Sequence, residues 1–184
     1  MKLTPLPLAG AFLVDVERIS DERGFFARQF CQKEFEEAGL AGTFVQWSIS
    51  YNAKKGTLRG MHFQTDGAEE TKLVRCVRGA IWDCILDLRP ESSTYGRWYG
   101  TELSSENRRM LYIPKGFAHG FLTLQPESEL LYFMDEFFSP GSSGGVRWND
   151  PQLRIEWPAQ PVVVSERDQG LPEFASLTEE RKPR

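Results

Sequence analysis

The chain has two histidines, and both occur where an imidazole could do chemistry. His62 lies in LRGMHFQ (58–64), which has the pattern of a strand, and His119 lies in YIPKGFAHGF (112–121), where proline and glycine predict a turn between strands. A lone histidine is more often structural than catalytic. The glycines near both histidines favour the chemical interpretation, because glycine lets a ligand approach the backbone closely. An imidazole with a pKa of about 6.5 can exchange a proton at neutral pH.

A lysine could bring a positive charge to the same interior. In the strand expected at 72–77, side chains alternate, so Lys72 shares one face with Val74 and Cys76. If that face is the interior one, the Lys72 ammonium lies at the mouth of the interior. The alternative is an exposed lysine, which is the common location of this residue type.

One spacing matches a known superfamily motif. Pro114, Gly116 and His119 form P-x-G-x-x-H, which resembles the second motif of the cupin superfamily, a small jelly-roll barrel. The first cupin motif carries H-x-H, and here Gln64 stands in place of its second histidine. A neutral carboxamide is a poor ligand for a divalent transition metal, and Lys72 would add an ammonium to the same cavity. We therefore expect no metal, with cationic side chains taking over its electrostatic role.

Composition and charge exclude several classes of protein. Hydrophobic residues make up 40% of the chain and charged residues 26%, a mixture that can bury a core. The net charge of −4 provides no basic surface for a nucleic acid. The longest apolar run is about six residues, against the roughly 20 that a membrane-spanning helix needs, and we expect no signal peptide. We therefore expect neither a nucleic-acid nor a membrane partner.

The cysteines indicate a reducing compartment. There are three, an odd number without C-x-x-C spacing, so a disulfide scaffold and a cysteine-based zinc site both fit poorly. This usage predicts a cytoplasmic protein. Cys76 and Cys84 lie in apolar, strand-like segments and are expected to be small core residues.

Short strands must position these groups, because β-branched and aromatic residues alternate with Gly, Pro, Asn and Asp along most of the chain. The expected strands are 44–51, 57–64, 72–77, 80–88, 110–113, 120–124, 130–137 and 162–164. Arg78-Gly79 predicts a two-residue hairpin between the third and fourth of these. The continuous apolar run at 80–82 predicts a strand that is covered on both faces.

Helices are expected to be few. The pattern QKEFEEAGL predicts a helix over 32–40, and a short helical turn is expected at 104–109. A polar tail from about residue 175 is expected to fray. These elements predict a single domain over 1–184 that is mainly β, a sandwich or barrel with jelly-roll topology.

Six stretches of the sequence resemble the dTDP-4-dehydrorhamnose 3,5-epimerase family of nucleotide-sugar epimerases. They are DERGFF (21–26), KKGTLRGMHFQ (54–64), KLVRCVRGAIWDCILDLR (72–89), IPKGFAHGF (113–121), RWNDP (147–151) and VSERD (164–168). The resemblance implies a cupin-type jelly-roll barrel and a nucleoside-diphosphate 4-keto-6-deoxyhexose as the substrate. It also implies that no cofactor is needed, because a ketone at C4 acidifies the C–H bonds at C3 and C5.

The resemblance implies four catalytic residues. His62 matches the family's base, and Asp168 matches the carboxylate that orients it. Tyr132 matches the acid that returns a proton to the opposite face of the carbanion; the alternative is a structural core tyrosine. Lys72 matches the cation that stabilises the developing oxyanion at C4.

The resemblance also implies the substrate contacts. Arg59 and His119 match positions near the diphosphate or the sugar, and Asp83 matches a position behind them. Arg23 would contact the nucleotide from the neighbouring subunit, which implies a homodimer. The remaining expected contacts are Phe26, Gln46 and Gln64.

Three positions depart from the family pattern. Arg28 stands where an acidic residue is common near the nucleotide base; a guanidinium cannot accept a thymine N–H, so the base could be another one. Trp47 replaces a polar residue and could stack on a base or pack. Phe138 replaces a tyrosine near the sugar, and losing its hydroxyl is either a neutral packing change or a restriction of the reaction to one carbon.

These departures leave alternatives to the 3,5-epimerase open. One is a single-centre epimerase, at C3 or C5, or a keto-isomerase that acts on a non-thymidine nucleotide sugar. The others are a metal-dependent cupin oxygenase and a non-catalytic sugar-binding cupin.

Overall fold

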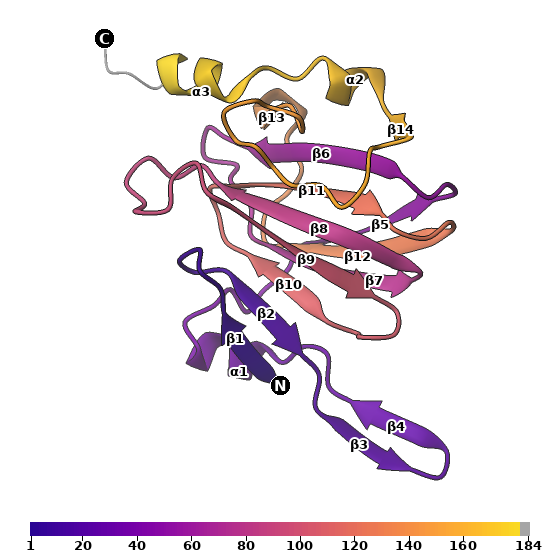
Figure 1. The fold of residues 1–184 in the computed structure, drawn as a ribbon. Helices are drawn as coiled ribbons and strands as arrows, with labels where there is room; N and C mark the ends of the chain where they lie inside the picture. The colour runs from indigo at the N-terminus through magenta and orange to yellow at the C-terminus, as the bar shows by residue number, and fades with distance from the viewer. Residues whose placement is uncertain (181–184) are drawn as a thin grey trace.

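Two mostly antiparallel β-sheets face each other in the computed structural model, which describes residues 1–180 (Figure 1). The first sheet has the order β1 (Lys2–Pro5), β2 (Phe12–Asp15), β10 (Met110–Ile113), β7 (Lys72–Arg78), β12 (Ser128–Met134), β5 (Gln46–Asn52). The second sheet has the order β13 (Ser143–Gly145), β6 (Thr57–Gln64), β11 (Phe117–Thr123), β8 (Ala80–Asp87), β9 (Trp98–Ser104), and β14 (Val163–Val164) pairs with β6 in parallel. The architecture is the mainly β, cupin-type jelly roll that the sequence predicts.

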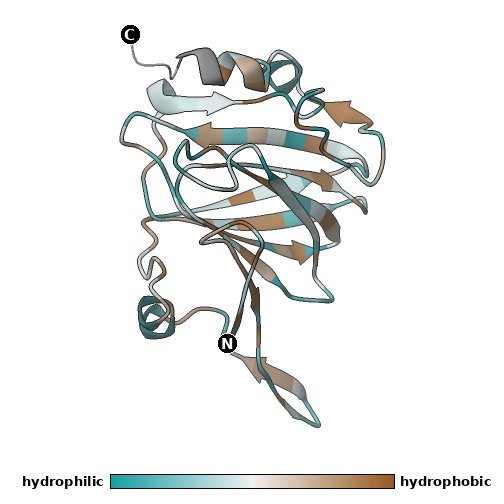
Figure 2. Ribbon diagram, turned by 60° about the vertical axis from the view of Figure 1, so that its left-hand side comes forward, coloured by the Kyte–Doolittle hydropathy of each residue, from teal (hydrophilic) through white to brown (hydrophobic). Residues whose placement is uncertain are grey.

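The main core lies between the two sheets, where alternate residues of each strand point inward. Val74 and Cys76 of β7 are fully buried there, against Ile81 and Ile85 of β8. Figure 2 shows the resulting alternation of hydrophobic and hydrophilic positions along the strands. Because Lys72 has the same parity as Val74, its side chain also faces inward, at the end of the strand.

A second core covers the outer face of β8. Cys84 and Leu86 point away from the first core and pack with Val146, Leu153 and Phe174 of the C-terminal part of the chain. This strand is therefore covered on both faces, as its continuous apolar sequence predicts.

The predicted hairpin at Arg78-Gly79 is wrong. β7 pairs with β10 and β12 in the first sheet, whereas β8 pairs with β11 and β9 in the second. The chain crosses from one sheet to the other at Gly79, whose φ is +71° and where a Cβ atom would lie 2.5 Å from the Ser128 hydroxyl oxygen. Glycine here serves a sheet-to-sheet corner, which has the same local sequence signature as a tight hairpin.

Some strand limits agree with the prediction and others differ from it, because hydrogen-bonded pairing with a neighbouring strand, rather than residue propensity, decides where a strand begins and ends. Thr57–Gln64 and Met110–Ile113 form strands with the predicted limits, whereas the strand predicted at 120–124 begins at Phe117. His119 therefore lies within β11 and not in a turn. The strands missed by the sequence are short or lack a clear pattern: β1, β2, β9, β13, β3 (Arg18–Asp21) and β4 (Gly24–Ala27).

The helices are short. Over residues 1–180 they are α1 (Gln32–Glu37), α2 (Glu166–Gln169), α3 (Phe174–Glu180) and a 3-10 turn at Pro140–Ser142. The helical turn expected at 104–109 is a non-helical turn, in which Asn107 Oδ1 accepts from the Ser104 and Arg109 N–H groups. No helix within this part of the chain has the length and apolar character that a membrane crossing requires.

The tail expected to fray from about residue 175 instead continues α3 to Glu180. The helix is anchored at its start, because the Phe174 ring is buried against Tyr95 and the Phe174 N–H donates to Asp150 Oδ2 at 2.8 Å. The last four residues of the chain, 181–184, lie outside the described residues.

The β3–β4 hairpin projects from the body of the molecule (Figure 1). Ile19 and Phe26 on this hairpin are 72% and 71% exposed, which is unusual for large apolar side chains. A second group of exposed apolar side chains lies on the outer side of the edge strand β5, where Trp47 is 73% and Ile49 is 61% exposed.

Candidate active site

The second sheet brings the two histidines side by side. β6 and β11 are antiparallel neighbours, and His62 lies directly opposite His119 in their register. Residues that face each other in this way project from the same side of a sheet, so both imidazoles point toward the space between the sheets. The two histidines are 57 positions apart in the sequence, and the pairing of β6 with β11 brings them together.

His62 is held by a carboxylate from the C-terminal part of the chain. Its Nε2 lies 2.7 Å from Asp168 Oδ1, and the second carboxylate oxygen accepts the Gly60 N–H at 3.0 Å. The side chain of His62 is 34% exposed, whereas that of Asp168 is only 5% exposed. The imidazole thus has one edge against a buried carboxylate and the other toward an open space.

The ionised carboxylate fixes the tautomer of the imidazole. Although burial opposes it, hydrogen bonds from His62 and from the Gly60 N–H hold the pKa of Asp168 below its ordinary value. An ionised carboxylate can only accept, so His62 Nε2 carries the proton and donates it. Nδ1 is then the nitrogen that can take up a proton, which is the state required of a general base.

His119 forms a second, more deeply buried pair. Its Nε2 lies 2.6 Å from Asp83 Oδ1 on the neighbouring strand β8, and both side chains are at most 5% exposed. The His119 ring meets the Tyr132 ring edge-on, with 5.9 Å between centroids. His119 and Asp83 therefore support Tyr132 from behind and do not line the cavity that His62 faces.

Tyr132 and Lys72 come from the opposite sheet. Tyr132 lies on β12 across from Val74, and Lys72 lies two residues before Val74 on the adjacent strand β7. Both side chains line a cavity of about 360 Å³ between the sheets, which His62 lines from the facing sheet. A base, a phenol and an ammonium thus converge on one space from two opposing walls.

The phenol of Tyr132 is set to remain protonated. Burial and the nearby Asp83 carboxylate raise the pKa of Tyr132 well above its ordinary value, against the opposing charge of Arg59. A neutral phenol can donate a proton, whereas a phenolate could not. Tyr132 is therefore an acid candidate on the wall opposite the base.

The glycines beside the histidines have a structural role that differs from the one expected. A Cβ atom at Gly60 would lie 2.5 Å from the Gly120 Cα, and one at Gly120 would lie 2.8 Å from the Arg59 carbonyl oxygen. They let β6 and β11 approach each other closely, so the expectation that they admit a ligand to the backbone is wrong.

Several of the expected substrate contacts line the cavity with His62. They are Gln46, Gln64 and Phe138. Gln46 Oε1 accepts the Phe138 N–H at 2.6 Å, and Gln64 Oε1 accepts the Ser139 N–H at 2.7 Å, so both amides also hold the loop that carries Phe138. With its amide committed to this loop, Gln64 positions the cavity wall.

The other expected contacts lie away from the cavity. Arg23 and Phe26 are on the projecting hairpin, and Arg28 pairs with Glu34 at 3.2 Å. Trp47 points outward from β5 and packs edge-on against Phe133. None of these four residues lines the cavity.

Arg59 is exposed and lies just beyond the cavity. Its Nε donates to Asn52 Oδ1 at 2.8 Å, and its charge acts on Tyr132.

Sequence reasoning missed six residues that line the cavity. They are Ser48, Phe63, Glu70, Met134, Ser143 and Arg167. Three carried a usable signal. Ser48 has the parity of Gln46, and Arg167 immediately precedes Asp168. Glu70 carried a similar signal, because it lies two residues before Lys72 in an extended segment.

A metal site has little support from the side chains present. Over residues 1–180, no group of three or more His, Cys, Asp or Glu side chains is placed to hold an ion.

Comparison with known proteins identifies relatives of this chain. The sequence model of the family described as dTDP-4-dehydrorhamnose 3,5-epimerase matches residues 5–176. The dTDP-4-dehydrorhamnose 3,5-epimerase of Salmonella typhimurium is 45% identical over 171 residues, which cover 91% of this chain and 93% of that protein.

Solved structures give the same result. The crystal structure of dTDP-4-dehydrorhamnose 3,5-epimerase from Elizabethkingia anophelis has a TM-score of 0.93 at 41% sequence identity. The superposition covers 96% of this chain and 97% of the Elizabethkingia chain. The structure of the Legionella pneumophila enzyme in complex with dTDP-4-keto-L-rhamnose has a TM-score of 0.90 at 35% sequence identity. The superposition covers all of this chain and 97% of the Legionella chain.

Proposed function

The chain belongs to the dTDP-4-dehydrorhamnose 3,5-epimerase family, and from this premise we propose that it inverts C3 and C5 of a dTDP-linked 4-keto-6-deoxyhexose. It is an enzyme, an isomerase of nucleotide sugars. The observation that carries the proposal is the convergence of His62, Lys72 and Tyr132 on one cavity, with base and acid on opposing walls.

The first step is proton abstraction by His62. Nδ1 takes the hydrogen from the carbon next to the C4 ketone, and the electron pair of the broken C–H bond forms the C=C bond of an enolate. The imidazolium that results is stabilised by Asp168, 2.7 Å from Nε2. The negative charge moves to the C4 oxygen.

Lys72 stabilises that oxygen. Its side chain is 12% exposed, so the ammonium is largely shielded from bulk water. A preorganised donor of this kind contributes about 3 kcal/mol to transition-state stabilisation. The positive charge of Lys72 thus takes the role that a metal has in other cupins.

The second step is reprotonation by Tyr132. The enolate collapses to the ketone, and the carbon takes the phenolic proton on the face away from His62, which inverts the centre. The phenolate formed is near Arg59, whose positive charge favours it. Proton exchange with water then restores the imidazole and the phenol for the second centre.

Two guanidiniums are candidates for the diphosphate. Arg167 lines the cavity and donates to Ser143 Oγ at 2.9 Å, and Arg59 lies beyond Tyr132. Because a guanidinium presents two parallel N–H groups to a phosphate, these residues would hold the nucleotide end and leave the sugar at His62.

We also propose a homodimer. The exposed apolar side chains on β5 and on the β3–β4 hairpin are surfaces that a monomer would leave in water. In a dimer the hairpin would reach the neighbouring subunit, so that Arg23 and Phe26 would complete that subunit's nucleotide site. A cytoplasmic location also remains a prediction of the sequence.

Deuterium exchange tests the proposed reaction. The protein is incubated with dTDP-4-keto-L-rhamnose in D₂O, and incorporation at each carbon is followed by NMR. We expect exchange at both C3 and C5, and none with a His62→Asn variant. Exchange at a single carbon would identify a single-centre epimerase, the alternative that Phe138 raises, and no exchange with any nucleotide 4-keto sugar would refute the proposal.

A further inference from the structure

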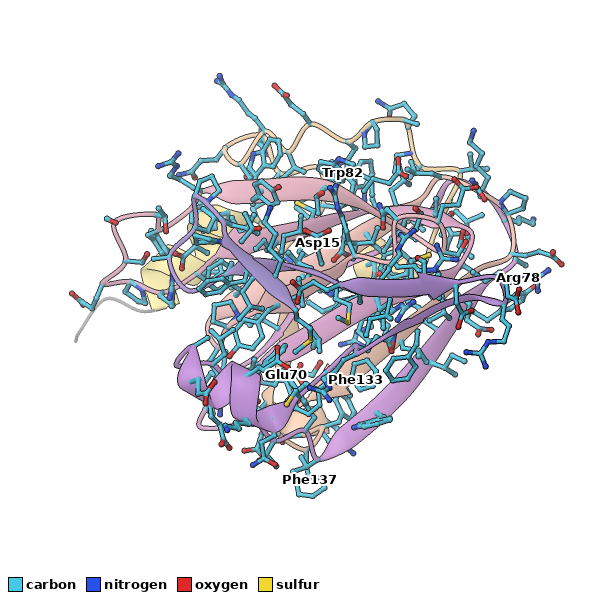
Figure 3. The ribbon with its side chains drawn as sticks, turned by 90° about the horizontal axis from the view of Figure 1, so that it is seen from below. Asp15, Glu70, Arg78, Trp82, Phe133 and Phe137 are labelled. Carbon is cyan, nitrogen blue, oxygen red and sulfur yellow. The ribbon has the colours of Figure 1, made fainter. Side chains whose placement is uncertain are left out.

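The cavity contains one ionisable side chain that the proposed mechanism does not use. Glu70 lines the same wall as Lys72, and its Oε1 lies 3.0 Å from Lys72 Nζ. The side chains are 10% and 12% exposed, so this ion pair is largely shielded from water. In Figure 3 the Glu70 side chain lies within the outline of the molecule, whereas Phe137 and Arg78 lie at its edge.

Backbone hydrogen bonds anchor the segment that carries both members of this ion pair. Glu70 lies two residues before Lys72, the first residue of β7, and both side chains line the cavity. Between them, the Thr71 N–H donates to Asp135 Oδ1 at 2.6 Å, and the Thr71 carbonyl oxygen accepts the Asp135 N–H at 3.2 Å. The backbone between Glu70 and Lys72 is therefore anchored independently of the ion pair.

The other charged groups at the cavity have partners of their own. His62 pairs with Asp168, and Arg167 donates to Ser143 Oγ. Tyr132 is a neutral phenol on the adjacent strand. Over the described residues 1–180, Glu70 is the carboxylate within ion-pair distance of Lys72.

We propose that Glu70 is a positioning residue that directs the Lys72 ammonium at the ketone oxygen of the substrate. A lysine side chain has four flexible bonds, and an unanchored ammonium would sample many positions, including ones that extend into the solvent. Anchoring one of its N–H groups on Glu70 leaves the other two for the developing oxyanion. This inference rests on the proposed function, because it assigns Lys72 to that oxyanion.

Three variants separate position from charge. Glu70→Gln keeps the length and an oxygen that accepts from Nζ, but removes the negative charge. Glu70→Ala removes the acceptor, and Glu70→Met removes it while filling the same space, in case the smaller side chain destabilises the fold. Glu69→Gln is the matched control, because this neighbouring carboxylate lines a different pocket.

The measurement is kcat and KM for dTDP-4-keto-L-rhamnose by deuterium wash-in. We expect kcat to fall about 10- to 100-fold in Glu70→Ala and Glu70→Met, because a displacement of about 1 Å at a reacting group has an effect of this size. KM should stay within about twofold of the wild-type value, since the lost interaction is made in the transition state. Glu70→Gln should keep kcat within about threefold, and Glu69→Gln should not change it.

A double-mutant cycle completes the test. If Glu70 acts through Lys72, then Glu70→Ala has no further effect on kcat in a Lys72→Ala background. Wild-type kcat in folded Glu70→Ala and Glu70→Met would overturn the inference. So would an equal loss in Glu70→Gln, a change confined to KM, or additive losses in the cycle. Failure of the proposed function is distinguishable, because the wild-type protein itself would then show no exchange.

Discussion

Replacing Asp168 by asparagine tests the assignment of His62 as a base directly. The side-chain shape is retained, but one of its two oxygens becomes an NH₂ group. The Gly60 N–H, which lies 3.0 Å from Oδ2, requires an acceptor and therefore binds the remaining amide oxygen. The amide NH₂ group then faces His62 Nε2 at the position where Oδ1 now lies, 2.7 Å away.

The consequence is a change of tautomer. Nε2 must now accept, so the proton of a neutral imidazole moves to Nδ1, the nitrogen needed to abstract hydrogen from the sugar. The imidazolium also loses its carboxylate partner. An equivalent substitution in a serine-protease triad lowers kcat about 10⁴-fold, and we expect a loss of about 10³- to 10⁴-fold, or about 4 to 5 kcal/mol.

The assay is deuterium wash-in at C3 and C5 with the folded variant. Its fold should persist, because the Asp168 N–H still donates to Ser165 Oγ at 3.1 Å, and circular dichroism verifies this. The control is Glu166→Gln, an exposed position on the same helix, which should keep the wild-type rate. A folded Asp168→Asn variant with a rate within a few-fold of wild type would refute the tautomer argument.

Three further predictions follow from the same structure. Tyr132→Phe should lower inversion at least about 100-fold, while His62 still exchanges hydrogen with retention; NMR of the recovered substrate distinguishes the two, and undiminished inversion would exclude Tyr132 as the acid. Ile49→Arg on the exposed face of β5 should shift the protein from dimer to monomer in analytical ultracentrifugation, and an unchanged dimer would place the interface elsewhere. Asp87→Asn should destabilise the fold by about 2 kcal/mol at pH 7, because hydrogen bonds from Arg89, Ser92 and Thr94 lower the pKa of Asp87 to about 2 in spite of its burial. Because its pKa is lower in the folded protein, ionised Asp87 stabilises the fold fully above the unfolded pKa of 3.8, and this stabilisation is lost as the pH falls toward about 2. The difference in free energy of unfolding between wild type and variant, measured in urea, should therefore shrink over that pH range.

Local patterns in the sequence defined several elements well. The strand Thr57–Gln64 has the predicted limits, since turn residues bound it on both sides. The side-chain alternation of β7 put Val74, Cys76 and Lys72 on one face and left open whether that face is interior; in the structure it is, and Lys72 lines the cavity. Burial accordingly raises the pKa of the Cys76 thiol to about 11, as suits a core residue.

The same local signals failed where long-range pairing decides. Arg78-Gly79 resembles a hairpin in sequence but is a corner between sheets, because β7 and β8 pair with strands of different sheets. His119 follows turn-like residues but lies in β11, where it pairs across to His62 and Ile85. A turn signature records which backbone angles are permitted, and it contains no information on which sheet receives the next strand.

The sequence by itself determined the family, the alternation of each strand and the kinds of group available for acid–base chemistry. Tertiary structure decided which of them meet. His62 and Asp168 are 106 residues apart, and they come together because β14 pairs with the start of β6 and delivers α2 to it. The physical reason is that alternation fixes the face from which a side chain projects, whereas the pairing of distant strands fixes what it finds there.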